Sequence, residues 1–324
     1  VVGALERLRP GGRLGMVLPA ELLHVLHAGS VRAYLKRTCR RVNVIDPAAL
    51  WFEGTLQGVV LLLAERKREP GEGCRIGLVA WPGQDLPDVP AATLIDGAPT
   101  LPADALPGKW LRALLPSDAL GVLDRLEQLP DVARMGTLAR SQVGVVTGAN
   151  GFFLVDEATV REHDLGTHAR PMFGRSRLVP GVVYDRDVHE ANRQAGLPVH
   201  YLDLGERPRE ALGDGARAWI ARGEAAGLHR RYKCRIREPW WAVPSVWASP
   251  VAMLKRCHDL PRLVLNRMGA LTTDTAYRIT PYEVSAERLV HGFVNSATAL
   301  YAELEGRHYG GGVLELVPSE IATL

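Results

Sequence analysis

The densest group of chemically active side chains in this sequence is a basic stretch between residues 230 and 278. It holds ten basic residues and three acidic ones, although the whole chain carries a formal net charge of only +3. The basic residues are Arg230, Arg231, Lys233, Arg235, Arg237, Lys255, Arg256, Arg262, Arg267 and Arg278. Such an excess of positive charge attracts a polyanion, and nucleic acid is the first candidate. The alternative is that a GC-rich genome fills ordinary surfaces with arginine.

Aromatic and small polar residues interleave with these charges and extend the candidate binding surface. Arginine can pair bidentately with guanine, whereas lysine or arginine on phosphates adds affinity without reading sequence. We therefore predict nucleic-acid contacts for Asn150, Arg175, Arg177, Lys233, Arg235, Arg237, Trp240, Asn266, Arg267, Thr272, Thr273, Arg307 and Tyr309. Burial in a core remains the alternative for the tryptophans. Ordinary turn formation remains the alternative for the residues that stand beside glycines.

Other kinds of chemistry find less support in the sequence. His24 and His27 are three residues apart and could share a metal ion, but no carboxylate or cysteine completes a ligand set. The four cysteines are scattered without a Cys-x-x-Cys pair, so we expect no zinc and a reducing cytoplasm. Nucleophile-elbow, Walker and His-Glu-x-x-His motifs are absent from the sequence. The first residues do not form a signal peptide, and we expect an internal fragment.

The elements expected in residues 1–67 belong to an α/β domain. Residues 13–19 form a short apolar run after a Pro-Gly-Gly turn, which predicts a buried strand. Apolar residues recur at helical spacing over 20–39, and 41–46 and 56–64 predict two further strands. A helix must bury its apolar stripe and a sheet both of its faces, so this segment should not form a domain alone. We predict that it closes an α/β domain.

The remaining sequence predicts a connector, residues 68–136, and a second domain, residues 137–324. The connector begins with a charged, Pro/Gly-rich break and contains a strand at 74–81 and a helix over 109–129. Residues 141–155 predict two strands joined by a tight Gly/Asn turn. Later patterns predict a helix over 208–222, strands at 263–265 and 276–279, and a helix over 289–304.

Four stretches, taken in order, carry a family resemblance. They are residues 8–20 with their Pro-Gly-Gly turn, Leu50-Trp51-Phe52-Glu53 followed by 59–67, the Gly144–Asn150 run before two phenylalanines, and the glycine-rich segment 306–320. Together they resemble the N6-adenine DNA methyltransferases of restriction–modification systems whose target-recognition domain follows the catalytic domain. The first two are similar to late catalytic motifs, and the last two to the ends of the recognition domain.

The resemblance implies a fold, a cofactor and a partner. The fold would be the C-terminal part of a Rossmann-like class I methyltransferase sheet followed by a mixed α+β target-recognition domain. The family uses S-adenosylmethionine, acts on double-stranded DNA and flips its adenine out of the stack. Phe52 stands where such enzymes place an aromatic ring against the flipped base; a core position is the alternative. Further partners would be a separate N-terminal catalytic half or a restriction subunit.

The sequence also departs from the family pattern. It contains neither an Asp-x-Gly-x-Gly turn nor a Pro-Pro pair, and Gly310–Gly312 is no substitute because it does not join a strand to a helix. We therefore expect no cofactor site in this chain and no activity of the chain alone. Our hypothesis is a methyltransferase fragment that supplies mainly target recognition. The alternatives are a non-enzymatic DNA-binding specificity module of a split restriction–modification system and a protein–protein scaffold without DNA affinity.

Overall fold

The chain divides into two compact units in a computed structural model that describes residues 1–47, 58–81, 90–309 and 312–324. Unit 1 comprises Val1–Ala133 and Leu300–Glu315, and unit 2 comprises Arg134–Ala299 and Leu316–Leu324. This division differs from the predicted one, because most of the expected connector and a segment near the C-terminus pack with unit 1. No helix among the described residues has both the length and the apolar character needed to cross a bilayer.

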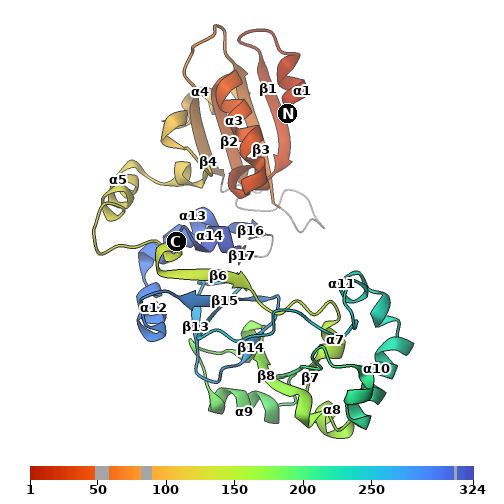
Figure 1. Cartoon of the computed structure of the whole chain (residues 1–324). Helices are drawn as coiled ribbons and strands as arrows, with labels where there is room; N and C mark the ends of the chain where they lie inside the picture. Colours follow the sequence, from red (N-terminus) through yellow and green to blue (C-terminus); the bar gives the residue numbers. More distant parts are fainter. Residues whose placement is uncertain (48–57, 82–89, 310–311) are drawn as a thin grey trace. The chain divides into compact units, whose positions relative to one another are not determined.

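Unit 1 is built on a five-stranded sheet with the order β1-β3-β2-β4-β5 (Figure 1). Its strands are β1 (Arg13–Pro19), β2 (Cys39–Pro47), β3 (Val59–Arg66), β4 (Arg75–Trp81) and β5 (Leu101–Pro102). β3 runs antiparallel to β1 and β2, whereas β2 and β4 are parallel, so β1, β2 and β4 share one direction. β3 pairs with β1 on one side and with β2 on the other, so it lies inside the sheet, as its apolar residues on both faces predicted.

β1 departs from its prediction, although its bounds match. It lies at the edge of the sheet with an alternation of exposed and half-buried residues, and Val17 is 47% exposed. The expectation of a buried strand was therefore wrong, because apolar composition alone does not tell a central strand from an edge strand. One row of backbone groups on β1 faces away from β3.

The helices of unit 1 are shorter than predicted. They are α1 (Val2–Glu6), α2 (Glu21–His24), η1 (Leu26–Ala28), α3 (Gly29–Thr38), α4 (Ala91–Gly97), η2 (Ala103–Ala105), η3 (Leu111–Leu114) and α5 (Ser117–Leu126). The helix expected over 20–39 is interrupted at Val25, whose backbone is extended. The break is stable because the buried Arg32 guanidinium donates to the carbonyls of Leu22 and Val25, both at 2.9 Å. The hairpin of β16 (Arg307–Tyr309) and β17 (Val313–Glu315) completes the unit.

Unit 2 contains two sheets. The first has the order β6-β15-β11-β13-β9 and is antiparallel except for its last pair. Its strands are β6 (Ala139–Val143), β15 (Ala276–Pro281), β11 (Val251–Leu254), β13 (Leu263–Asn266) and β9 (Val183–Tyr184). The second has the order β14-β8-β10-β7, with strands β14 (Leu271–Thr272), β8 (Ala169–Phe173), β10 (His200–Leu202) and β7 (Leu154–Val155). The strands predicted at 263–265 and 276–279 are confirmed, and each pairs with β11.

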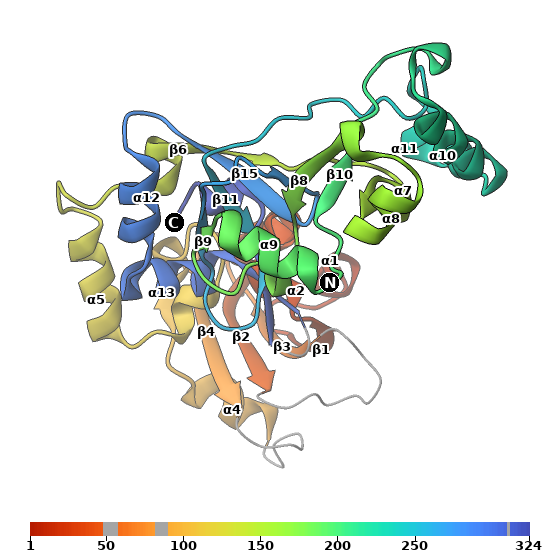
Figure 2. The same cartoon turned by 90° about the horizontal axis from the view of Figure 1, so that it is seen from below.

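Short helices surround the two sheets of unit 2. They are α6 (Met135–Leu138), α7 (Asn150–Phe153), α8 (Glu157–Glu162), η4 (Gly166–His168), η5 (Ser176–Leu178), α9 (Arg186–Gln194), η6 (Arg209–Ala211), α10 (Asp214–Ala225), η7 (Leu228–Arg230), α11 (Tyr232–Arg235), α12 (Ala286–Phe293) and α14 (Pro318–Ile321). The helix predicted over 289–304 is divided in two, because α12 ends at Phe293 and α13 (Ser296–Glu305) begins at Ser296. The unit boundary falls within α13. Within unit 2, α10 and α11 lie at one end and α12 at the other (Figure 2).

The hairpin predicted over residues 141–155 was wrong. β6 pairs with β15 and β7 pairs with β10, in different sheets, and residues 150–153 form α7 instead of a strand. The reason is the burial of the paired rings of Phe152 and Phe153, which pack against Trp219, Tyr201 and Trp240. The short helix turns both rings into one core, whereas successive residues of a strand would point to opposite faces.

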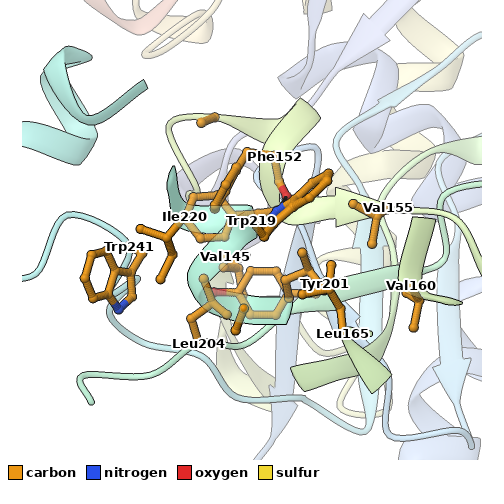
Figure 3. Packing of buried hydrophobic residues seen from close by; sticks show 14 of the residues in the cluster. Val145, Phe152, Val155, Val160, Leu165, Tyr201, Leu204, Trp219, Ile220 and Trp241 are labelled. Carbon is orange, nitrogen blue, oxygen red and sulfur yellow. Dashed lines mark hydrogen bonds between the residues drawn. The ribbon is translucent and has the colours of Figure 1, made fainter. Parts of the chain in front are cut away.

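That core supports one end of unit 2. Phe152 and Trp219 stack with ring centroids 5.6 Å apart, and the Trp219 indole donates to the carbonyl of Phe152 at 3.2 Å (Figure 3). The cluster also includes Val145, Phe153, Val160, Leu165, Tyr201, Leu204, Ile220, Cys234, Trp240 and Trp241. Large aromatic side chains contribute most of the buried area of such a small core. The core therefore fixes α7, α10 and the segment that follows α11 to one another.

Candidate nucleic-acid interface

Unit 2 carries a groove of about 440 Å³ where β8 and β11 end. Its lining residues are Gly174, Arg175, Ser176, Arg177, Leu254, Lys255, Arg256, Asp274 and Thr275. Four of these side chains are cationic and one is anionic, so the groove has an excess of positive charge suited to an anion. We call this set of residues the basic groove.

The wall of the basic groove is held by a hydroxyl relay. Thr275 Oγ1 donates to the carbonyl of Gly174 at 2.5 Å, and Thr273 Oγ1 lies 2.7 Å from Thr275 Oγ1. A Cβ atom on Gly174 would come within 1.9 Å of Thr273 Oγ1, so this position requires glycine. The Lys255 N–H donates to the Thr275 carbonyl at 3.1 Å. These bonds fix the backbone from which the cationic side chains extend.

The cations of the basic groove are accessible. Arg175 and Arg177 are exposed, and neither side chain makes a hydrogen bond within the described part of the chain. Arg256 is exposed and Lys255 is half-buried. Asp274 Oδ1 is buried and has no hydrogen-bond partner among the described residues. Its single charge leaves the groove with a net positive balance.

A second basic surface surrounds α11. Arg230, Arg231, Lys233 and Arg235 are all exposed there. Together with Tyr232 and Ile236 they form what we call the α11 tip, residues 230–236, apart from the buried Cys234.

The α11 tip is attached firmly to the rest of unit 2. The Arg237 guanidinium donates to the carbonyls of Val146 and Thr147 at 2.7 and 2.8 Å. The Cys234 side chain is fully buried, with its Sγ 3.9 Å from the Thr147 carbonyl. Gly148 has a φ of +79°, and a Cβ atom there would lie 2.6 Å from Lys233 Cβ, so the turn of residues 147–150 packs directly on α11.

Residues 107–324 match the family described as Type II methyltransferase M.Eco57I, C-terminal domain. The chain belongs to this family. The match covers more than half of the chain and confirms the resemblance to methyltransferases of restriction–modification systems that the four motifs indicated.

Individual proteins also show similarities to the chain. The chain is 24% identical over 200 residues to the Type II methyltransferase M.XamI of Xanthomonas campestris pv. amaranthicola, which covers 59% of this chain and 35% of the relative. It therefore spans about a third of that relative's length. The solved Type IIL restriction-modification enzyme MmeI, in complex with DNA, has a TM-score of 0.52 at 10% identity over 96% of this chain and 38% of its own. The Type IIG restriction endonuclease BpuSI has a TM-score of 0.42 at 12% identity, covering 99% of this chain and 40% of its own.

The predicted contact residues of this C-terminal domain fall into separate groups. Those exposed on unit 2 are Asn150, Arg175, Arg177, Lys233, Arg235 and Arg267. The structure brings Arg175 and Arg177 together in the basic groove, and Lys233 and Arg235 together on the α11 tip. Asn150 begins α7, where its Oδ1 accepts a hydrogen bond from Thr147, and Arg267 lies in the turn after β13. Their contacts with nucleic acid remain predictions.

Several other predicted residues lie in the interior, which corrects the expectation that they contact nucleic acid. Trp240 is 9% exposed, and its indole donates to Glu224 Oε1 at 3.3 Å. Asn266 is 7% exposed; its amide donates to the carbonyls of Ser249 and Ala270 at 2.8 Å and accepts from the Ala270 N–H at 3.0 Å. These groups are fully used in holding loops together.

The buried set also contains Thr272 and Thr273, and the half-buried Arg237 acts in the same way. Both threonines are buried, and Thr273 serves the relay behind the basic groove. Arg237 is half-buried and bonded to backbone carbonyls, so its role is to position α11. We assign these residues to support and not to contact.

The last predicted residues do not lie in unit 2. Arg307 and Tyr309 are half-buried in β16 of unit 1, and Phe52 lies outside the described residues. Two groupings were missed: Lys255 and Arg256 in the basic groove, and the pairing of Tyr232 with Ile236 on the α11 tip. Charge counting included the first pair without placing it beside Arg175. An isolated isoleucine between two arginines was the available signal for the second pair.

Proposed function

We propose that unit 2 recognises double-stranded DNA for a methyltransferase of a restriction–modification system, and that the complete enzyme flips an adenine and methylates its N6. The observation that carries the proposal is that one unit presents two accessible cationic surfaces. They hold eight basic side chains, four lining the basic groove and four on the α11 tip. The DNA present in the solved MmeI complex, which has a similar fold, supports this choice of polyanion.

The geometry of the basic groove favours backbone phosphates over base edges. Its cations extend from a wall that the hydroxyl relay holds in place, an arrangement that suits anions such as backbone phosphates. Phosphate contacts fix the register of a protein on a duplex but carry no sequence information. We therefore assign affinity to the basic groove, and expect sequence reading from exposed residues such as Arg267 and Asn150.

Unit 1 is proposed to supply the closing strands of the Rossmann-like catalytic sheet. The edge strand β1 has a row of backbone donors and acceptors that no other described strand pairs with. Such an edge is a template for another strand. We propose that the remaining catalytic strands of the complete enzyme pair with β1. Ligands of open α/β sheets bind beyond the carboxyl ends of parallel strands, which places the reaction near the ends of β1 and β2.

S-adenosylmethionine is the methyl donor that the family implies. A site for it needs a glycine-rich turn between a strand and a helix. Among the described residues of unit 1, β1 ends at Pro19 and α2 begins at Glu21, and the turn between them through Ala20 has no glycine. These residues do not fit the cofactor. We propose that the cofactor site belongs to the rest of the complete enzyme.

The proposal is tested by titrating the chain into a fluorescently labelled random-sequence duplex and following anisotropy at several salt concentrations. We expect log affinity to fall linearly with log salt, because each phosphate contact releases counterions. A duplex with an uncharged peptide backbone is the control and should not bind. Affinity that is independent of salt, or equal binding of the uncharged duplex, would refute DNA recognition by phosphate contact. Mapping the methyl group that the complete enzyme adds tests the N6 assignment separately.

A further inference from the structure

The α11 tip presents two large apolar side chains to solvent in the most basic part of the chain. Tyr232 is 63% exposed and Ile236 is 61% exposed. Tyr232 begins α11 and Ile236 is the residue that caps its end, so the two are four positions apart and lie on the same face. Lys233 Nζ and Arg235 Cζ each lie 5.6 Å from the centre of the Tyr232 ring. An apolar pair enclosed by cations is unusual for a surface that meets only water.

The exposure of this pair is imposed by the supports on the opposite side of α11. Cys234 points into the core, Arg237 is bonded to two carbonyls of the preceding loop, and Gly148 packs against Lys233. The helix therefore cannot rotate to bury Tyr232 and Ile236 without losing these contacts. A rigid backbone with outward apolar side chains has the properties of a wedge, since insertion needs a tip that does not yield.

We propose that Tyr232 and Ile236 insert between base steps of duplex DNA while Arg230, Arg231, Lys233 and Arg235 hold the phosphates on either side. The inference rests on the proposed function, because it takes the same DNA as its ligand. Charge complementarity selects this occupant: the four exposed cations of residues 230–236 flank the apolar pair along the chain, and a stacked base step is the apolar surface that lies between two rows of phosphates.

The wedge would change the shape of the DNA. Aliphatic and aromatic side chains that enter a base step unstack it and kink the duplex. An aromatic ring also stacks on any base, so insertion by Tyr232 does not depend on sequence. When DNA binds, Lys233 and Arg235 exchange their contact with the Tyr232 ring for phosphates, which frees the ring face for a base. Unstacking beside the target lowers the cost of extruding a base from the helix.

The experiment compares the full chain with its Tyr232→Ala/Ile236→Ala variant on random-sequence duplexes. Permanganate oxidation reports unstacked thymines at any position, and energy transfer between dyes at the two duplex ends reports bending. Saturating wild-type chain should raise thymine reactivity and shorten the end-to-end distance. The variant should lose both effects and keep the salt dependence of binding, because no cation is removed. Its affinity should fall by less than about tenfold, since lost contacts are offset by base steps that stay stacked.

A matched control is Tyr282→Ala/Val294→Ala, which removes two other exposed apolar side chains of unit 2. It should behave as the wild type. Wild-type binding that leaves thymine reactivity and duplex length unchanged would overturn the wedge and leave DNA recognition intact. A wedge variant that still distorts the duplex would also overturn it. Absence of any duplex binding by the wild-type chain would overturn both proposals. Circular dichroism checks that each variant is folded.

Discussion

Replacing Arg175 and Arg177 with glutamine tests the basic groove directly. Both side chains are exposed, line the groove and make no hydrogen bond within the described structure, so their loss should not disturb the fold. Glutamine keeps most of the length of arginine and removes only its charge. The double variant therefore isolates the electrostatic contribution of two cations to DNA binding.

The expected magnitude follows from counterion release. Each phosphate contact contributes about 0.9 to the slope of log affinity against log salt, so two lost contacts should reduce the slope by about 1.8. Between 50 and 200 mM salt, this difference corresponds to roughly a twelvefold smaller loss of affinity in the variant than in the wild type. The two proteins should therefore differ most at low salt.

Anisotropy titrations of one labelled duplex across this salt range measure the slope. The control is Arg186→Gln/Arg207→Gln, which removes two exposed arginines of unit 2 that lie neither in the basic groove nor on the α11 tip. Its slope should equal that of the wild type. If both double variants reduce the slope equally, affinity comes from diffuse charge. If neither does, the basic groove is not a phosphate site.

Other predictions concern stability and pH. Gly174→Ala should lower the free energy of unfolding by at least about 1–3 kcal/mol in urea titrations, because the added Cβ would lie 1.9 Å from Thr273 Oγ1. Adding Thr273→Ala should restore part of the lost stability. An unchanged urea midpoint in Gly174→Ala would contradict the relay. Asn266→Ala should lower the free energy of unfolding by about 1–3 kcal/mol, because its buried amide is hydrogen-bonded, and Arg267→Ala should lower it by less than about 0.5 kcal/mol, because Arg267 is exposed. Equal losses would contradict the burial of Asn266 and the exposure of Arg267. Burial, and then the nearby cations, lower the pKa of His24 from 6.5 to about 3. Between these two pKa values the His24 side chain is protonated in the unfolded chain and neutral in the folded chain, so stability should fall as pH drops from 6.5 towards 3. The expected loss in the free energy of unfolding is on the order of 2–3 kcal/mol at pH 4.5. His24→Leu should flatten that part of the stability–pH profile in urea titrations, and an unaltered profile would place the pH dependence elsewhere.

The strands of unit 1 could be located from sequence because their apolar runs are short and bounded by turn residues. The predicted strand at 13–19 has the bounds of β1, and the run at 74–81 gave β4 almost entirely. The exposure of a strand could not be predicted in the same way. Val17 is apolar, as residues of buried strands usually are, but its exposure depends on whether another strand pairs with β1.

The sequence of residues 141–155 could not distinguish a hairpin from what the structure contains. Gly148 and Asn150 suit a tight turn, and the flanking apolar residues suit strands. The outcome was decided by partners far along the chain, since Phe152 and Phe153 pack with Trp219 and Trp240. Tertiary packing of four aromatic rings outweighs the local preference for a turn.

Counting charge over residues 230–278 overstated the positive charge that this segment presents at the surface. Arg278 is buried, with its guanidinium donating to the carbonyls of Val143 and Ser245 and lying 4.1 Å from the Trp247 ring centre. Arg262 similarly donates to two backbone carbonyls. An arginine side chain can donate hydrogen bonds to the carbonyls of irregular loops as readily as to phosphates, and the sequence does not tell which of these two partners it has.

The fold of unit 2 explains why some of its arginines are buried and others are exposed. Unit 2 has short strands and many connecting loops, so carbonyls lack strand partners, and buried arginines such as Arg278 and Arg237 satisfy them. Once the loops are fixed, the remaining cations gather on rigid backbone at the basic groove and the α11 tip. Loops on a rigid scaffold are the usual carriers of specificity. Exchanging the exposed turn around Arg267 should therefore alter the recognised sequence and leave the salt dependence of binding unchanged, since the phosphate contacts of the basic groove and the α11 tip come from other residues.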